Sequence, residues 1–193
     1  MSYNEYSIIY FDDCVINRSP NRNVIQAIES LSEGHGLHIL YCLKIRMAGM
    51  DCKSAIEFLQ KALIHRKLEY QHRKQILLII YDHPFVDGSV KLITSAKNYA
   101  YFTRDLDNFS PKDSKITDDL EKLIIKNSPY VNIEGIEYSV SNSSYLDNYI
   151  HFLALFYLEN IPCYPLLFHV PAQVTSEDLK CVIEKLNKKL SEP

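Results

Sequence analysis

The stretch Ser143–Pro171 constrains this chain most, because it is almost wholly apolar and changes its secondary structure midway. It predicts a turn, an apolar helix, a short connection flanked by prolines, and a buried strand. A helix and a strand of this composition are satisfied only inside the core of an α/β layer. Asp147 lies near the start of the helix and His169 near the end of the strand. Because active sites of open α/β sheets form at the carboxyl ends of strands, these two residues are the first site candidates.

The rest of the chain alternates between short apolar runs and segments with helical spacing. Strands are expected at Tyr6–Phe11, Leu37–Cys42, Gln75–Tyr81 and Ile133–Val140, and Ser89–Phe102 is expected to be strand-like with a polar interruption. Helices are expected at about 20–31, 51–68 and 116–126, and again after Pro171, where Thr175 and Asp178 form a capping signal. This alternation predicts a three-layer α/β/α sandwich with a mixed, mostly parallel central sheet. A length of 193 residues without linkers predicts a single domain over residues 1–193.

Composition and missing motifs argue against several classes of protein. The net charge of −3 gives no general attraction to nucleic acid or to an anionic membrane. No run reaches the roughly 18 apolar residues of a membrane span, and the amino terminus does not resemble a signal peptide. The five cysteines are scattered and form no CxxC pair, which favours reduced thiols in the cytoplasm over a metal site. No glycine-rich nucleotide-binding loop, GxSxG or HExxH is present, so no cofactor is expected.

Two polar segments offer further alternatives. The basic stretch His65–Lys74 could contact phosphate groups, or its cations could complement the carboxyl end of a helix. Asp82 and His83 follow the most hydrophobic strand and could serve as ligands or catalytic groups. With Pro84 next to them, a polar end of a loop is the simpler interpretation.

Two motifs in the opening stretch carry a family resemblance. They are Tyr145, Leu146, Asp147, Asn148 and Tyr149 at the start of the helix, and Phe168, His169, Val170 and Pro171 at the end of the strand. With this spacing they resemble pyroglutamyl peptidase I, a family of cysteine peptidases. Weaker similarity in Ser19–Ile28, Ser89–Asn98 and Asp107–Asn108 extends the resemblance over nearly the whole chain. It implies the phosphorylase/hydrolase-like form of the α/β/α sandwich.

The departures from the family pattern concern the catalytic groups. In this family a thiolate attacks the peptide carbonyl, a histidine transfers protons, and a glutamate orients the histidine. Carried over by position, His169 is the retained histidine. Asp147 stands at the position of the nucleophile, and Ile93 stands at the position of the glutamate. Ile93 cannot accept a proton from an imidazole, so the resemblance implies that the peptidase chemistry is lost.

The loop after the first strand also departs from the family. The family has glycines, a proline and a second phenylalanine there, which shape the substrate pocket, whereas this chain has Asp12, Asp13 and Cys14. Together with Asp147 and His169, these residues are expected to line what remains of the cleft. Such a cleft could bind a cationic or hydrogen-bonding group, or a partner chain could cover it.

Three hypotheses follow. The first is a pyroglutamyl-peptidase-like pseudoenzyme that acts as a binding or assembly protein, with a protein partner or a second copy of itself. The second is a hydrolase that uses a displaced nucleophile, Cys14 or Asp147, with His169. The third is a protein associated with nucleic acid through residues 65–74. For Asp147 a structural role is also open, since a carboxylate at a helix start is stabilised by the helix dipole and could form an ion pair with His169.

Overall fold

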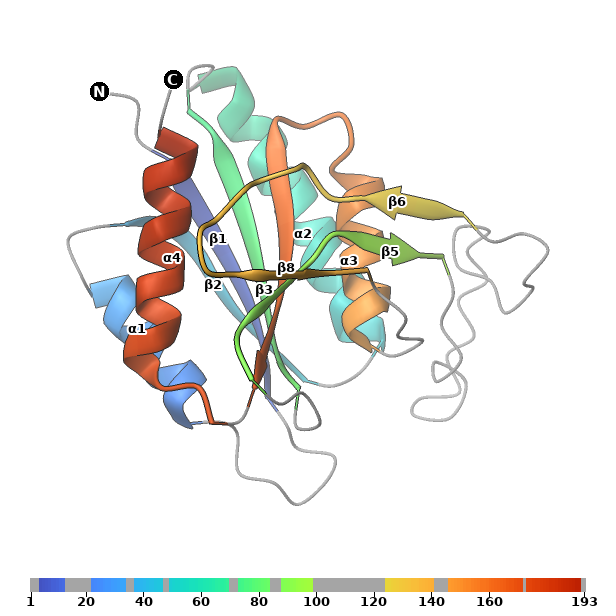
Figure 1. Cartoon of the computed structure of the whole chain (residues 1–193). Helices are drawn as coiled ribbons and strands as arrows, with labels where there is room; N and C mark the ends of the chain where they lie inside the picture. Colours follow the sequence, from blue (N-terminus) through green and yellow to red (C-terminus); the bar gives the residue numbers. More distant parts are fainter. Residues whose placement is uncertain are drawn as a thin grey trace.

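A computed structural model describes residues 4–12, 22–33, 37–46, 49–69, 73–83, 88–98, 124–140, 146–171 and 173–191 of the protein. In this part of the chain, six strands form a central sheet (Figure 1). Their spatial order is β2 (His38–Arg46), β1 (Glu5–Asp12), β3 (Gln75–His83), β8 (Cys163–Pro171), β4 (Lys91–Ile93) and β7 (Glu137–Ser139). The first four strands are parallel, β4 is antiparallel to β8, and β7 is parallel to β4. The sheet is therefore mixed and mostly parallel, as predicted.

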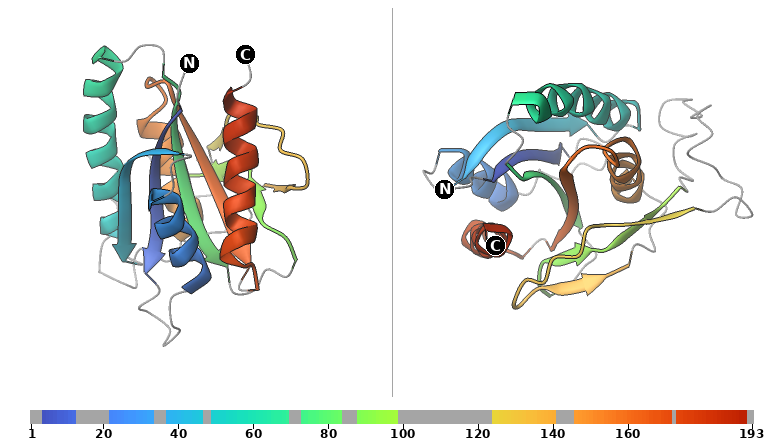
Figure 2. Two further views of the ribbon diagram at one scale, coloured as in Figure 1. Left: turned by 90° about the vertical axis from the view of Figure 1, so that its left-hand side faces the viewer. Right: turned by 90° about the horizontal axis from the view of Figure 1, so that it is seen from above.

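Helices cover both faces of this sheet, which completes the three-layer sandwich (Figure 2). One face carries α2 (Gly49–Glu69) and α3 (Leu146–Tyr157), and the other carries α1 (Arg22–Glu33) and α4 (Ser176–Ser191). Each strand of the middle of the sheet is apolar on both sides because both of its faces are covered. The predicted fold class is confirmed.

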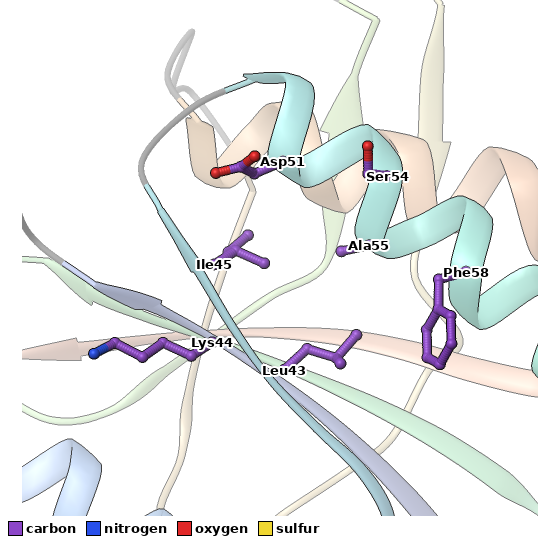
Figure 3. Close-up of a pocket in the computed structure, with 7 residues that line it drawn as sticks. All are labelled: Leu43, Lys44, Ile45, Asp51, Ser54, Ala55 and Phe58. Carbon is purple, nitrogen blue, oxygen red and sulfur yellow. The ribbon is translucent and has the colours of Figure 1, made fainter.

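The outer strand β2 and helix α2 enclose an open groove of about 430 Å³ (Figure 3). Its lining consists of Leu43, Lys44, Ile45, Asp51, Ser54, Ala55 and Phe58. Strand β2 pairs with β1 on one side, and its register shifts near Leu40, which gives the strand an irregular start and a regular end. This groove lies at an outer edge of the sheet and shares no residue with the apolar stretch Ser143–Pro171.

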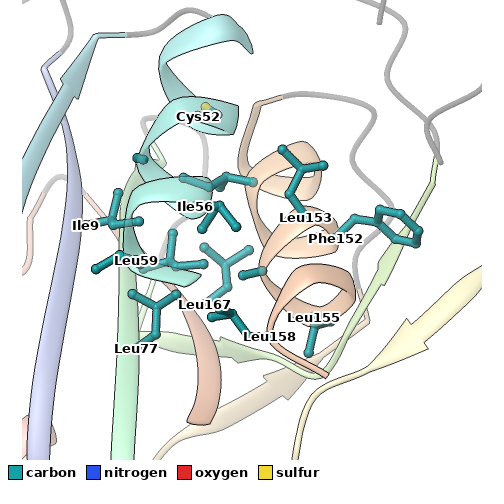
Figure 4. Close-up of a cluster of buried hydrophobic side chains, with 14 of the residues drawn as sticks. Ile9, Cys52, Ile56, Leu59, Leu77, Phe152, Leu153, Leu155, Leu158 and Leu167 are labelled. Atoms are coloured by element: carbon teal, nitrogen blue, oxygen red, sulfur yellow. The ribbon is translucent and has the colours of Figure 1, made fainter. Parts of the chain in front are cut away.

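Helix α3 lies in the larger of the two cores (Figure 4). Every residue from Leu146 to Leu155 is buried, because α2, β8 and a separate pair of short strands surround the helix. A helix that is apolar all round requires such an environment. The prediction that the helix and the strand of residues 143–171 belong to the core is confirmed.

The segments between β4 and β7 differ most from expectation. The helix predicted at 116–126 is wrong at its end, because Ile125–Asn127 forms β6, which pairs antiparallel with β5 (Ser95–Lys97); residues 116–123 lie outside the described part. The side chain of Asn98 accepts a hydrogen bond from the Ile124 backbone, and this pairing overrides a helical spacing of apolar residues. The segment Ser89–Phe102, expected to be strand-like with a polar interruption, is divided at Thr94 into β4 and β5, which belong to different sheets, and residues 99–102 lie outside the described part. That change of sheet could not be predicted from its composition.

Two further strands have boundaries that differ from expectation. The strand expected at Ile133–Val140 is confined to β7, because Gly135 adopts a φ of 79° in a turn before it. Strand β3 continues to His83, so the backbone of Asp82 and His83 belongs to the strand and not to a loop. Their register partners are Val170 and Pro171 of β8.

Side chains of the basic stretch at residues 65–74 bind polar groups at the end of the sheet where β1 begins. The buried carboxylate of Glu5 accepts hydrogen bonds from both Nε and NH2 of Arg66 and from Arg73, at 2.6–3.1 Å. Lys74 donates to the carbonyl of Leu190 at 2.8 Å. Burial alone would raise the pKa of Glu5, but the two arginines outweigh it and lower this pKa. Because two of its cations hold a buried carboxylate, the stretch is better explained as structural than as a phosphate-binding patch.

Substitution of Glu5 by glutamine should lower the free energy of unfolding at pH 7 by about 2–3 kcal/mol, because Arg66 and Arg73 lose a charged partner. The pKa of the Glu5 carboxyl is lower in the folded than in the unfolded protein. The stabilisation that the ionised carboxyl gives is therefore complete above the pKa of the unfolded state, and it is lost as the pH falls through the pKa of the folded state. Urea unfolding of both proteins between pH 7 and pH 3 measures this. An undiminished difference in stability at the acid end would contradict the assignment.

Candidate functional site

The candidate site lies between the first turn of α3 and the carboxyl-terminal half of β8. Asp147 is in the first turn of α3, where the unpaired backbone N–H groups of a helix start favour a negative charge. His169 pairs in register with Tyr81 on β3, and their rings lie 5.8 Å apart. The Tyr81 ring contacts Phe11 edge-on at 5.2 Å, so a row of rings crosses three strands on the face covered by α3. This row leads from β1 to the imidazole beside Asp147.

Asp147 and His169 form a direct, buried pair. Nε2 of His169 lies 2.9 Å from Oδ2 of Asp147, and the two residues are 7% and 1% exposed, respectively. A hydrogen bond between carboxylate and imidazole at this distance is of the strong, charge-assisted kind. Nε2 of His169 is therefore already engaged by a carboxylate.

A second histidine, His151, follows one helical turn after Asp147 and is fully buried. Its Nε2 lies 2.8 Å from the hydroxyl of Ser128, and that hydroxyl donates to the carbonyl of Ile93 at 3.2 Å. Because the hydroxyl has only one proton, Nε2 of His151 carries the proton of the shared hydrogen bond. Within the described part of the chain, Nδ1 of His151 has no hydrogen-bond partner.

The surroundings of His151 hold its ring in the neutral form. Burial lowers its pKa to about 3; the negative charge of Asp147 acts against this shift, and His169 adds to it. A neutral imidazole with such a low pKa is a weak base at pH 7. The hydrogen bond between Ser128 and His151 is therefore a structural contact and lacks the properties of a nucleophile and its base.

Polar side chains of α3 also fix the β5–β6 pair to the outside of the helix. The side chain of Asn148 both accepts from and donates to the backbone of Lys97, at 2.8 and 2.9 Å. Lys126 of β6 forms an ion pair with Glu159 at 2.7 Å and lies over the ring of Phe156. Asn148 satisfies two backbone groups of β5 in the way that a neighbouring strand would. The motif of residues 145–149 therefore supports the fold as well as the candidate site.

The predicted site residues are brought together in part. His169, Asp147 and Ile93 lie on the α3 side of the sheet, and Ile93, which is 2% exposed, pairs in register with Leu167 of β8. Asp12 ends β1, and its side chain is not described, while Asp13 and Cys14 lie outside the described residues. The cleft expected from these three residues with Asp147 and His169 stays a prediction.

The cysteines of the described residues are all free, but they differ in exposure. Cys52 and Cys163 are buried, as expected for structural thiols, and burial raises the pKa of Cys163 to about 12. Cys42 and Cys181 are exposed. None of the four takes part in the hydrogen bonds of the Asp147–His169 pair.

A metal site and a membrane-spanning helix are two other features to consider. Among the described residues, no group of three or more histidine, cysteine or acidic side chains is placed to hold a metal ion. No helix in that part of the chain is both long enough and apolar enough to cross a membrane.

The fold and the pair define the class of protein only as an α/β/α sandwich with a buried acid–histidine pair at the end of an inner strand. No family model matches the chain, and no curated protein matches it. The family of the chain therefore enters as a proposal.

Proposed function

We propose that this chain is a pyroglutamyl-peptidase-like pseudoenzyme that acts as a binding or assembly protein. The observation that carries the proposal is the 2.9 Å contact between Asp147 and His169, both buried. The resemblance assigns these two positions to nucleophile and base, which must lie within hydrogen-bond reach of each other. A carboxylate in place of the thiolate keeps that geometry and removes the chemistry, since it is a poor nucleophile toward an amide.

The position of Ile93 adds support. Its side chain lies on the same side of the sheet as His169 and is buried in the core with Leu167. A glutamate at position 93 would lie on the strand next to His169 and could orient its imidazole, whereas isoleucine cannot accept a proton from the imidazole. Loss of the nucleophile and loss of the orienting acid at neighbouring places are what a scaffold without peptidase activity would show.

A hydrolase with a displaced nucleophile is the second candidate. It would use Cys14 or Asp147 with His169. The exposure of 1% at Asp147 is unfavourable for attack on a substrate, and a carboxyl group that hydrolyses amides needs a second carboxyl sharing a proton. Cys14 remains the better nucleophile of the two on chemical grounds.

The test is hydrolysis of a fluorogenic pyroglutamyl amide. We expect the wild-type turnover to stay below about 10⁻³ s⁻¹, about a thousandfold under the low end of ordinary kcat values, because a carboxylate, and not a thiolate, lies 2.9 Å from Nε2 of His169. The His169→Ala variant should give the same signal as the wild type, and both should match a blank without protein. An active pyroglutamyl peptidase serves as the positive control.

Turnover by the wild type that His169→Ala abolishes would overturn the pseudoenzyme proposal. Cys14→Ser and Asp147→Asn then identify the nucleophile, since only one of them should remove the activity. Circular dichroism of each variant distinguishes loss of activity from loss of fold.

A further inference from the structure

Strand β2 is an outer strand of the sheet formed by the described residues. In the described part of the chain β2 pairs only with β1, and after the irregularity near Leu40 the pairing runs in register from Tyr41 to Arg46. The backbone N–H and C=O groups on the opposite side of an outer strand are a template for strand addition. Peptide-binding domains use such an edge, and side-chain pockets beside it then provide specificity.

A groove with an apolar floor lies beside this same part of β2. Leu43 and Ile45 extend from the strand toward α2, where Ala55 and Phe58 face them (Figure 3). Phe58 is 48% exposed and contacts Tyr41 of β2 edge-on, with ring centroids 5.4 Å apart. An aromatic ring half in solvent beside a groove of about 430 Å³ is suited to cover an incoming apolar side chain.

The polar groups of the groove indicate the charge of its occupant. Asp51 and Ser54 lie on α2 above the apolar floor, whereas Lys44 extends from the other side of the strand (Figure 3). A side chain that follows the groove along α2 therefore meets a carboxylate and a hydroxyl. A basic or hydrogen-bond-donating group is complementary to both.

We propose that the β2–α2 groove binds an extended peptide segment of another protein by strand addition to β2. The segment would pair with Tyr41–Arg46, place an apolar side chain among Leu43, Ile45 and Phe58, and direct a basic side chain toward Asp51. This site shares no residue with the Asp147–His169 pair, so it does not rest on the pseudoenzyme proposal.

A second copy of the chain fits this edge less well. Two β2 strands paired about a two-fold axis would share only the regular part of each edge, which the irregularity near Leu40 shortens. A short partner segment does not meet this obstacle.

The test uses a fluorescein-labelled ten-residue peptide that alternates valine with lysine, followed by fluorescence anisotropy with the full chain. A control peptide has the same residues arranged as one valine block and one lysine block. We expect the alternating peptide to bind at least about tenfold more tightly than the block peptide, because only it presents one apolar and one basic face as a strand. Amide chemical shifts should change at Tyr41–Arg46 and Asp51–Phe58.

Variants locate the binding. Phe58→Glu and Asp51→Asn should each weaken the alternating peptide, the former by at least about tenfold, as for an aromatic anchor at an interface. The matched control is Ile64→Glu, which changes another exposed apolar residue of α2 (45% exposed) outside the groove and should leave affinity unchanged. Equal affinity for the two peptides, insensitivity to Phe58→Glu in a folded variant, or shifts confined to other surfaces would each overturn the proposal. So would a dimer of the protein alone that Phe58→Glu dissociates, which would make the occupant a second copy.

Discussion

Substitution of His169 by alanine should lower the free energy of unfolding by about 3–5 kcal/mol, because it removes a buried aromatic ring and one partner of a buried hydrogen bond. The carboxylate of Asp147 is 1% exposed and would lose its hydrogen bond of 2.9 Å without gaining water in exchange. Urea unfolding at pH 7, followed by circular dichroism, measures the loss. Asp147→Ala should cost less, because it removes a smaller side chain from the core.

The double variant with leucine at both Asp147 and His169 separates a structural pair from two independent residues. Replacing both partners of a buried hydrogen bond by apolar side chains of similar shape can be nearly neutral or stabilising. We therefore expect the double variant to be more stable than His169→Ala, and its cycle with the single variants Asp147→Leu and His169→Leu to be strongly non-additive. Leu167→Ala provides a matched core deletion on the same strand, and its effect should add to that of Asp147→Ala. Additive effects at positions 147 and 169 would contradict a coupled pair.

The sequence was most informative where one physical requirement dominated. The apolar stretch at residues 143–171 had to be buried, and it is α3 and β8 in the core. The capping signal at Thr175 and Asp178 is also present: Asp178 accepts from the Thr175 backbone at 3.0 Å, and the Thr175 hydroxyl accepts from the Asp178 backbone at 3.1 Å. Both features depend on residues close together in the chain, so local patterns sufficed to predict them.

Features that depend on distant contacts could not be predicted in this way. Strand β6 falls in a segment predicted to be helical from its apolar spacing, but pairing with β5 and contact with α3 decide its conformation. The hydrogen bond between His151 and Ser128 joins residues 23 positions apart and leaves no local pattern. The only sequence signal for His151 was its spacing of four residues from Asp147, which places both on one side of a helix. The groove likewise depends on how α2 crosses β2.

Acid should destabilise this protein through His151 as the pH falls from about 6.5 toward 3. In the folded chain, burial lowers the pKa of His151 to about 3, against an ordinary value of 6.5; Asp147 opposes the shift and His169 adds to it. The unfolded chain therefore binds the proton first. The stabilisation is complete above pH 6.5 and is lost as the pH falls from there toward 3, with a limiting slope of about 1.4 kcal/mol per pH unit.

Substitution by glutamine tests this pH dependence, because its side-chain amide can still donate to Ser128 and does not titrate. Between pH 7 and pH 5 the wild type should lose about 2 kcal/mol more stability than His151→Gln, measured by urea unfolding at each pH. Over this range Glu5, whose pKa is lowered, contributes little change. The matched control is His65→Gln, which replaces an exposed histidine of α2 and should keep the pH dependence of the wild type. Parallel pH profiles for the wild type and His151→Gln would mean that the ring of His151 accepts a proton as readily in the folded protein as in the unfolded chain. That result would contradict a neutral, buried imidazole at this position.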